Sequence, residues 1–227
     1  VETMRDAHGH LQRSATLPET LAYMPVEATA ALHLFLPAVG HYVEEYACWL
    51  LVSKEAGHAT LGLAYFGAER SAVEGTCNTS CSCYENFYTT AFAGGITQRI
   101  VEVAETAALH QRLRATLQFL RTLDPRWGNY LSARGEVNWG AVVLSGHIEG
   151  GDQAAWIAST YSLRRLVMFS APQGTCLGHL AALTDTLDVR GVFRKDEEAA
   201  TQIEANLVAM GCKDKHLFKL DSPLQRW

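Results

Sequence analysis

Positive charge is scarce in this sequence and is not concentrated in any run. The 227 residues contain 19 Lys and Arg against 24 Asp and Glu, so the formal net charge is −5 at pH 7. Nucleic-acid-binding domains usually carry a basic patch or stripe, so the composition argues against a nucleic-acid partner. Long hydrophobic runs are also lacking, because the longest uncharged stretch, 166–184, contains Pro172 and two glycines. It predicts a strand and a loop, and we expect a soluble protein with no transmembrane segment.

The sequence lacks an initiating methionine and a leader with positive and apolar parts, since it begins at Val1. This predicts that a targeting segment has been removed or lies outside the sequence, as in export or import into an organelle. A content of 48% hydrophobic and 19% charged residues suits one globular α/β domain. We expect an extended lead-in over 1–30 and a single domain over 31–227, with no internal repeat.

Strand and helix patterns alternate after the lead-in. Strands are predicted over 31–36, 59–65, 189–194 and 216–220, and helices over 41–55, 98–123 and 197–210. This alternation indicates a mainly parallel sheet flanked by helices.

The most informative stretch is 141–159, AVVLSGHIEGGDQAAWIAS, which predicts a buried strand, a sharp glycine turn and a helix. In a G-x-S-x-G turn the strand delivers a nucleophilic serine to a tight bend, and glycines two positions away prevent clashes. Here Gly146 and Gly150 retain the glycines, whereas Ile148 stands at the apex. The apex of such a turn has a positive φ, which costs a β-branched residue on the order of 1–3 kcal/mol.

This turn resembles the nucleophile elbow of α/β-hydrolases, specifically of bacterial-type serine hydrolases with a G-H-S-x-G-G sequence. Three flanking stretches extend the resemblance: 137–139 before the strand, 165–172 as the next strand and its loop, and 34–40 as the strand and loop that contribute an oxyanion-hole amide. The resemblance covers 32–221 and implies an α/β-hydrolase-like fold that is short at its C-terminus. The residues it places at the oxyanion region are Val39, Gly40, His147, Glu149 and Gly150. There the Glu149 amide is expected to bind an anion or a carbonyl without forming an acyl-enzyme.

A hydrolase triad also needs an acid and a histidine, and the sequence has a candidate only for the acid. Triads of this family run serine, acid, histidine, each after a strand. The resemblance places the acid at Asp196, with Asp185 and Asp188 as weaker alternatives, although a helix cap explains Asp196 as well. No histidine follows His216, which is expected to begin the last strand, and His179 precedes the acid. Two of the three catalytic positions are therefore empty.

No other side chain replaces the serine in this interpretation. Ser145 lies three positions before the apex and Ser170 follows the next strand, so the turn projects neither of them. His147 and His41 border the oxyanion region. The resemblance implies a packing and hydrogen-bonding role for His147, and His41 is expected to open a helix. A naturally degenerate hydrolase explains both the isoleucine and the missing histidine. An engineered substitution, a sequence error or a tail outside this sequence remain as alternatives.

The sequence contains six cysteines, and three of them, Cys77, Cys81 and Cys83, lie close together. Zinc sites use Cys-x-x-Cys pairs and four ligands, a pattern that these residues do not match, so no metal or other cofactor is expected. Similar hydrolases carry cysteines in this loop, which implies a disulfide within the loop or to the following helix, and an oxidising compartment. Cys48 and Cys212 are interpreted as packing residues. Asn78 begins a glycosylation sequon, a match that is common by chance.

The tryptophans are divided between the core and the surface. We expect Trp139, Trp156 and Trp49 in the core or in pocket walls. Trp127 and Trp227 lie in a loop and a tail and are expected to be exposed, available for a protein contact.

These observations favour a hydrolase-like protein that is inactive as a serine hydrolase and acts by binding. The first form of this hypothesis is an accessory subunit of a larger assembly, and the second is a binder of a small apolar ligand, with Ile148 extending the pocket wall. The alternative is an esterase- or lipase-like hydrolase whose nucleophile has been substituted and whose tail is absent.

Overall fold

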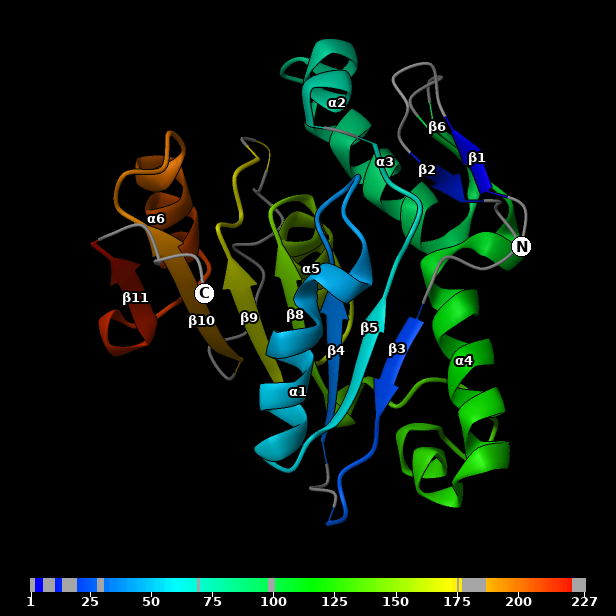
Figure 1. The fold of residues 1–227 in the computed structure, drawn as a ribbon. Coiled ribbons are helices and arrows are strands. Elements are labelled where there is room, and N and C mark those ends of the chain that lie inside the picture. Colours follow the sequence, from blue (N-terminus) through cyan, green and yellow to red (C-terminus); the bar gives the residue numbers. More distant parts are fainter. Residues whose placement is uncertain are drawn as a thin grey trace.

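A seven-stranded sheet forms the centre of the molecule, with the order β11-β10-β9-β8-β4-β5-β3 (Figure 1). The computed structural model describes residues 3–5, 11–13, 20–27, 31–68, 70–97, 101–174, 176 and 187–221. The strands of this sheet are β3 (Thr20–Tyr23), β4 (Leu32–Leu36), β5 (Ala59–Leu63), β8 (Val142–His147), β9 (Arg165–Phe169), β10 (Asp188–Arg194) and β11 (Leu217–Leu220). Neighbouring strands are parallel except for β3, which pairs antiparallel with β5. The mainly parallel sheet expected from the sequence is confirmed.

The strand β3 belongs to the stretch that the sequence assigns to an extended lead-in. Its register pairs Thr20 with Leu63 and Tyr23 with Thr60, and Leu21 packs against a buried cluster that includes Phe35. The sheet therefore starts before residue 31. The sequence analysis missed this strand because four residues are too few to show a clear hydrophobic period. Earlier still, β1 (Thr3–Arg5) and β2 (Leu11–Arg13) pair antiparallel with each other.

Helices cover both faces of the sheet, but unequally (Figure 1). The 3-10 turn η1 (Val43–Tyr46) leads into α1 (Ala47–Glu55), which packs on β5 and β3 and buries Leu50 completely. On the opposite face α5 (Glu149–Thr160) packs on β8 and β9, and α6 (Ala200–Ala209) packs on β10. The helices expected over 41–55 and 197–210 are present in shortened form.

The helix predicted over 98–123 is wrong in its first half. The chain instead forms β6 (Gly95–Thr97), β7 (Val101–Val103) and the 3-10 turn η2 (Glu105–Ala107) before α4 (Leu109–Leu123) begins. Gly94, just before β6, has a φ of 94°, and a Cβ atom there would lie 2.8 Å from the Cα of Glu105. The later part of the prediction holds, since Leu113 and Leu117 are fully buried.

The cysteine-rich stretch forms two helices, α2 (Arg70–Cys77) and α3 (Cys81–Ala93), which the sequence interpretation treated as a loop. Two disulfides lie there, Cys77–Cys83 and Cys81–Cys176. The expected disulfide within this stretch is confirmed, and the second one ties α3 to the segment after β9. Within the described part of the chain, no group of side chains suited to a metal ion is found.

The burial of Cys48 and of Trp127 differs from what the sequence predicts. Cys212 is buried as expected, whereas Cys48 is exposed on α1. Trp127 is 3% exposed and was expected at the surface. It lies in the 3-10 helix η3 (Pro125–Tyr130), whose first turn is capped by the Asp124 side chain and which folds Trp127 inward against Tyr130. Trp139 and Trp156 are buried, in agreement with the prediction.

The shorter remaining elements are the 3-10 turns η4 (Trp139–Ala141) and η6 (Asp214–His216). In the part of the chain that the structure describes, no helix is long and apolar enough to span a bilayer.

Candidate functional site

The turn between β8 and α5 has the backbone of a nucleophile elbow. Ile148 stands at its apex with φ 51° and ψ −115°, so the positive φ expected from the sequence is present. The Ile148 amide donates to the Phe169 carbonyl at 3.0 Å, and its carbonyl accepts from the amides of Gly151 and Asp152. These bonds hold the apex to β9 on one side and to α5 on the other. The strained conformation is therefore supported by the surrounding structure.

The glycines of the turn are required by close packing. A Cβ atom at Gly146 would lie 2.2 Å from the Gly150 carbonyl oxygen. One at Gly150 would lie 2.3 Å from the Leu36 carbonyl oxygen, and one at Gly151 would lie 2.3 Å from the Cβ atom of Ala171. The β8–α5 turn is thus packed directly against the ends of β4 and β9, and these positions leave no room for a Cβ atom.

The loop after β4 supplies the amides that were expected to form an oxyanion hole. The Val39 amide donates to Glu149 Oε2 at 3.4 Å, and the Ala38 amide donates to the Tyr46 hydroxyl at 3.4 Å. Gly40 has a φ of 82° in the tight turn of this loop. The Glu149 carboxylate therefore lies where a substrate carbonyl or an anion was expected, and its charge opposes the binding of an anion there.

His147 lies beside this loop and contacts Tyr46, with its Nδ1 2.8 Å from the hydroxyl oxygen. Burial lowers the pKa of His147, and the nearby His41 adds to the effect. Burial also raises the pKa of Tyr46 to about 12. Both groups are therefore neutral near pH 7, and a hydrogen bond joins the Tyr46 hydroxyl to His147 Nδ1 while the hydroxyl oxygen accepts from the Ala38 amide. His41 is exposed and pairs with Glu45 at 2.7 Å.

Ser145, which the sequence analysis rejected as a replacement nucleophile, is inside the core. Its Oγ lies 2.6 Å from His33 Nε2, and His33 Nδ1 lies 2.7 Å from Ser53 Oγ. Ser145 has no exposed surface and His33 is 3% exposed. Burial, with a smaller contribution from His58, lowers the pKa of His33 to about 3. This Ser–His pair links β4, β8 and α1, and no substrate reaches it.

The candidate acids lie in different places. Asp196 is exposed and pairs with the guanidinium of Arg194, with Arg194 Nε 2.8 Å from Oδ1. The carboxylate that faces the end of β9 is that of Glu197, which accepts from Ser170 Oγ at 2.7 Å and from the Arg194 amide at 2.7 Å. Ser170 itself has a φ of 48°. The sequence interpretation did not single out Glu197, which is one residue beyond Asp196.

Asp188, the other described alternative for the acid, is bound to arginines at the opposite end of β10. Asp185, His179 and Trp227 lie outside the described residues. His216 precedes β11 and lies near Asp188, with 3.2 Å between Nδ1 and Oδ1. Asp188 and His216 therefore lie away from the elbow and are not placed as triad members.

A pocket of about 350 Å³ opens near the carboxyl ends of the strands, on the face of the sheet that carries α1. It is lined by Phe35, Tyr46, Trp49, His147, Phe169, Ser170, Val192, Phe193, Arg194, Glu197 and Leu220. Ile148 and Glu149 do not line it, so the expected pocket wall at Ile148 is not part of this cavity. Trp49 does line it, as the sequence predicted. The sequence signal that could have pointed to this pocket is Phe169, an aromatic residue at the end of a strand. The sequence analysis interpreted it only as part of that strand.

The overall fold is shared with solved hydrolase structures. A sugar hydrolase from Lactococcus lactis superposes with a TM-score of 0.51 at 12% identity, over 89% of this chain and 78% of the other. The chain has the α/β-hydrolase fold. An α/β serine hydrolase homologue from Coxiella burnetii has a TM-score of 0.50 at 12% identity and covers 88% of this hydrolase-fold chain and 79% of its own. An esterase domain from Rhodothermus marinus has a TM-score of 0.50 at 11% identity, over 97% and 86%.

No protein-family model matches the sequence of this hydrolase-fold chain, and no curated protein matches it. At identities of 11–12% the structural likeness concerns the fold alone.

Proposed function

We propose that this hydrolase-fold protein acts by binding, as an accessory subunit of a larger assembly, and that its elbow performs no acyl transfer. The observation that carries the proposal is the apex of the elbow. Ile148 has no hydroxyl to attack an acyl carbon, and the Val39 amide is engaged by the Glu149 carboxylate. A rigid sheet with an unreactive elbow provides a platform for contacts.

The subunit hypothesis is tested by the native mass of the endogenous protein after gentle extraction, with mass spectrometry of the comigrating proteins. We expect migration well above the mass of a single chain, together with a constant set of partners. Migration at the mass of one chain would rule out the accessory-subunit role.

The loss of catalysis is tested by restoring serine with Ile148→Ser and treating the protein with a fluorophosphonate probe. We expect no labelling, because among the described residues no histidine is available as a base beside the apex: the Nδ1 of His147 is already bonded to Tyr46. Wild type is the matched control, and thermal unfolding checks that the variant is folded. Specific labelling of the variant would favour the alternative, an esterase- or lipase-like hydrolase whose nucleophile has been substituted.

A second candidate function is the binding of a small apolar ligand, and the pocket beside α1 favours it. Its volume of about 350 Å³ falls in the range of small-molecule sites, and aromatic rings line it. Organic extraction of the purified protein followed by mass spectrometry tests this candidate. A stoichiometric apolar compound that is lost in Phe169→Ala would support it, and an empty protein that migrates as a single chain would remove both binding roles.

We further infer that the protein resides in an oxidising compartment, secreted or in an organelle lumen. The two disulfides support this. Alkylation of the protein in freshly lysed cells should modify Cys48, which is exposed, while the four paired cysteines react only after reduction. Full alkylation before reduction would contradict the inference.

A further inference from the structure

The front of β9, β10 and β11 differs from the rest of the sheet because no described helix packs on it (Figure 1). Along β10 the buried residues alternate with partly exposed ones. Val189 and Phe193 point toward α6, and a Cβ atom at Gly191 would lie 2.3 Å from Leu207 Cδ1 of that helix. Arg190 and Val192 therefore face the opposite side, where α1 reaches only as far as the contact of Trp49 with Phe169.

An apolar row crosses this face. The strand register pairs Phe169 with Val192 and Val192 with Phe218, so the three side chains share one side of the sheet. Phe218 is 47% exposed, and the pocket beside Trp49 opens at the inner end of the row. An apolar row that ends in a pocket is a typical place for an anchoring side chain of a partner.

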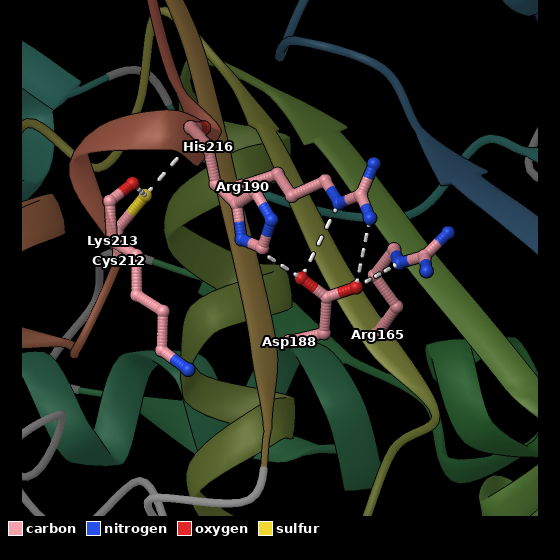
Figure 2. A network of polar contacts seen from close by, with 6 residues as sticks. All are labelled: Arg165, Asp188, Arg190, Cys212, Lys213 and His216. Carbon is pink, nitrogen blue, oxygen red and sulfur yellow. Dashed lines mark hydrogen bonds and ion pairs between the residues drawn. The ribbon is translucent and has the colours of Figure 1, made fainter.

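A cationic cluster lies beside the row, toward the amino ends of the same strands (Figure 2). Asp188 accepts from Arg165 Nε at 2.6 Å and from the Arg190 guanidinium at 3.0 Å, and His216 lies 3.2 Å away. Burial opposes ionisation of Asp188, but the hydrogen bonds and charges of Arg190 and Arg165 outweigh it and lower the pKa of its carboxyl. One carboxylate thus faces two guanidinium groups, and the cluster keeps an excess positive charge in a chain whose formal net charge is −5.

We propose that this open face, formed by the row Phe169, Val192 and Phe218 and by the cluster of Arg165, Asp188, Arg190 and His216, binds an acidic amphipathic helix of a partner protein. The inference rests on the proposed role as a subunit and names the surface and the kind of partner. It places an apolar side chain of the partner in the pocket and its carboxylates on the arginines. Guanidinium groups with unused N–H donors are well suited to carboxylates.

The spacing on β10 fits a helix laid along the strand. Val192 and Arg190 are two residues apart, about 6.6 Å, and four residues of an α-helix rise about 6 Å. An apolar residue at one helix position therefore brings an acid four residues away to Arg190, and a second acid one turn further to Arg165. A small ligand in the pocket does not span this distance, which favours a polypeptide as the occupant.

The test uses a photocrosslinking phenylalanine analogue at position 218 of the full chain in the cells that make it. After irradiation, mass spectrometry identifies the crosslinked peptide. We expect one partner segment with apolar residues at helical spacing and acidic residues about one turn along. The same analogue at Phe119, a 62% exposed residue on α4, is the matched control and should not capture that segment.

A synthetic peptide with the captured sequence then tests the charge contacts by fluorescence anisotropy. We expect Arg190→Glu to weaken its binding at least about tenfold and Arg190→Lys to weaken it less, because one lost charge pair at a partly buried site costs about one order of magnitude or more. Thermal unfolding checks both variants, and Phe218→Ser provides an independent loss of binding if Arg190→Glu does not fold.

Four results would overturn this inference: capture of a second copy of the chain, of another segment of the same polypeptide, of a partner segment without acids, or of nothing. If the protein nevertheless migrates in a large assembly, the proposed function stands and only the open face is assigned wrongly. Migration as a single chain would remove the proposed function itself.

Discussion

The two halves of the central sheet differ in how their faces are covered. Around β8 both faces are covered, the elbow glycines pack against neighbouring backbone at distances that exclude a methyl group, and a disulfide ties α3 to the segment after β9. Around β10 and β11 one face is covered by α6 and the other is open. The closed half has the α/β-hydrolase fold, with isoleucine at the apex of its elbow. The open half presents the exposed Phe218 and a partly exposed cluster in which Arg165 and Arg190 share the Asp188 carboxylate.

The largest expected effect is that of Gly150→Ala in the closed half. A Cβ atom there would meet the carbonyl oxygens of Leu36 and Pro37 at 2.3 and 2.5 Å, which are backbone atoms that cannot move independently. We expect destabilisation of about 4 kcal/mol or more, or no folded protein. Gly75→Ala in α2 is the control, because nothing lies within 4 Å of that Cβ position. Similar urea midpoints for the two variants would mean that the elbow is less tightly packed than described.

The disulfide Cys81–Cys176 closes a loop across 95 residues, whereas Cys77–Cys83 spans only 6. Loop-closure entropy predicts that replacing the first pair with serines costs about 5 kcal/mol and replacing the second about 2 kcal/mol. Chemical unfolding of the two double variants measures the difference. A greater loss for Cys77–Cys83 would show that local packing around α2 and α3, and not the loop length, sets the stability of this region.

The buried His33 predicts a pH dependence that belongs to the closed half. Its pKa in the folded state is about 3, below the ordinary histidine value of 6.5, so the folded state disfavours the proton. The stability it confers is complete above pH 6.5 and is lost as the pH falls toward 3, by about 1.4 kcal/mol per pH unit. We expect His33→Gln to flatten the dependence of unfolding free energy on pH between 6 and 5. An unchanged slope would place the titration elsewhere.

The smallest expected effect is that of Phe218→Ala on the open face. Phe218 is 47% exposed, so its truncation should change the unfolding free energy by less than about 1 kcal/mol. Phe193→Ala is the matched variant on the covered face of β10, where the side chain is 2% exposed and the cost should be about 3–5 kcal/mol. Equal losses in a denaturant titration would mean that Phe218 is part of the core and that the face is not open.

Much of the sheet could be predicted from the sequence because buried strands carry strong local signals. The run from Val142 to His147 and the alternating pattern of β10 are visible directly in the residues. The boundaries of helices were less certain, as the false start of the 98–123 helix shows. In that stretch β6 pairs with β7, and Gly94 lies close to Glu105. The hydrophobic periodicity of the sequence reveals neither of these contacts.

The candidate site also has a part that the sequence predicted and a part that it did not. The glycine frame identified the elbow and its positive φ, because that turn is encoded within five consecutive residues. Glu197 and the pocket were missed, since they depend on how β9, β10 and α1 meet. The placement of the Glu149 carboxylate on the Val39 amide joins residues 110 positions apart. No periodic pattern contains that information.

The sequence by itself determined the parallel α/β architecture, the glycine elbow and the absence of a serine at its apex, because each of these follows from residue type and short-range spacing. Only the tertiary structure decided that Ser145 is sealed in the core with His33, that Cys81 pairs with Cys176, and that β9–β11 have an open face. Those features arise where segments distant in the chain meet. Their physical basis is packing and charge between neighbours that the order of the residues does not show.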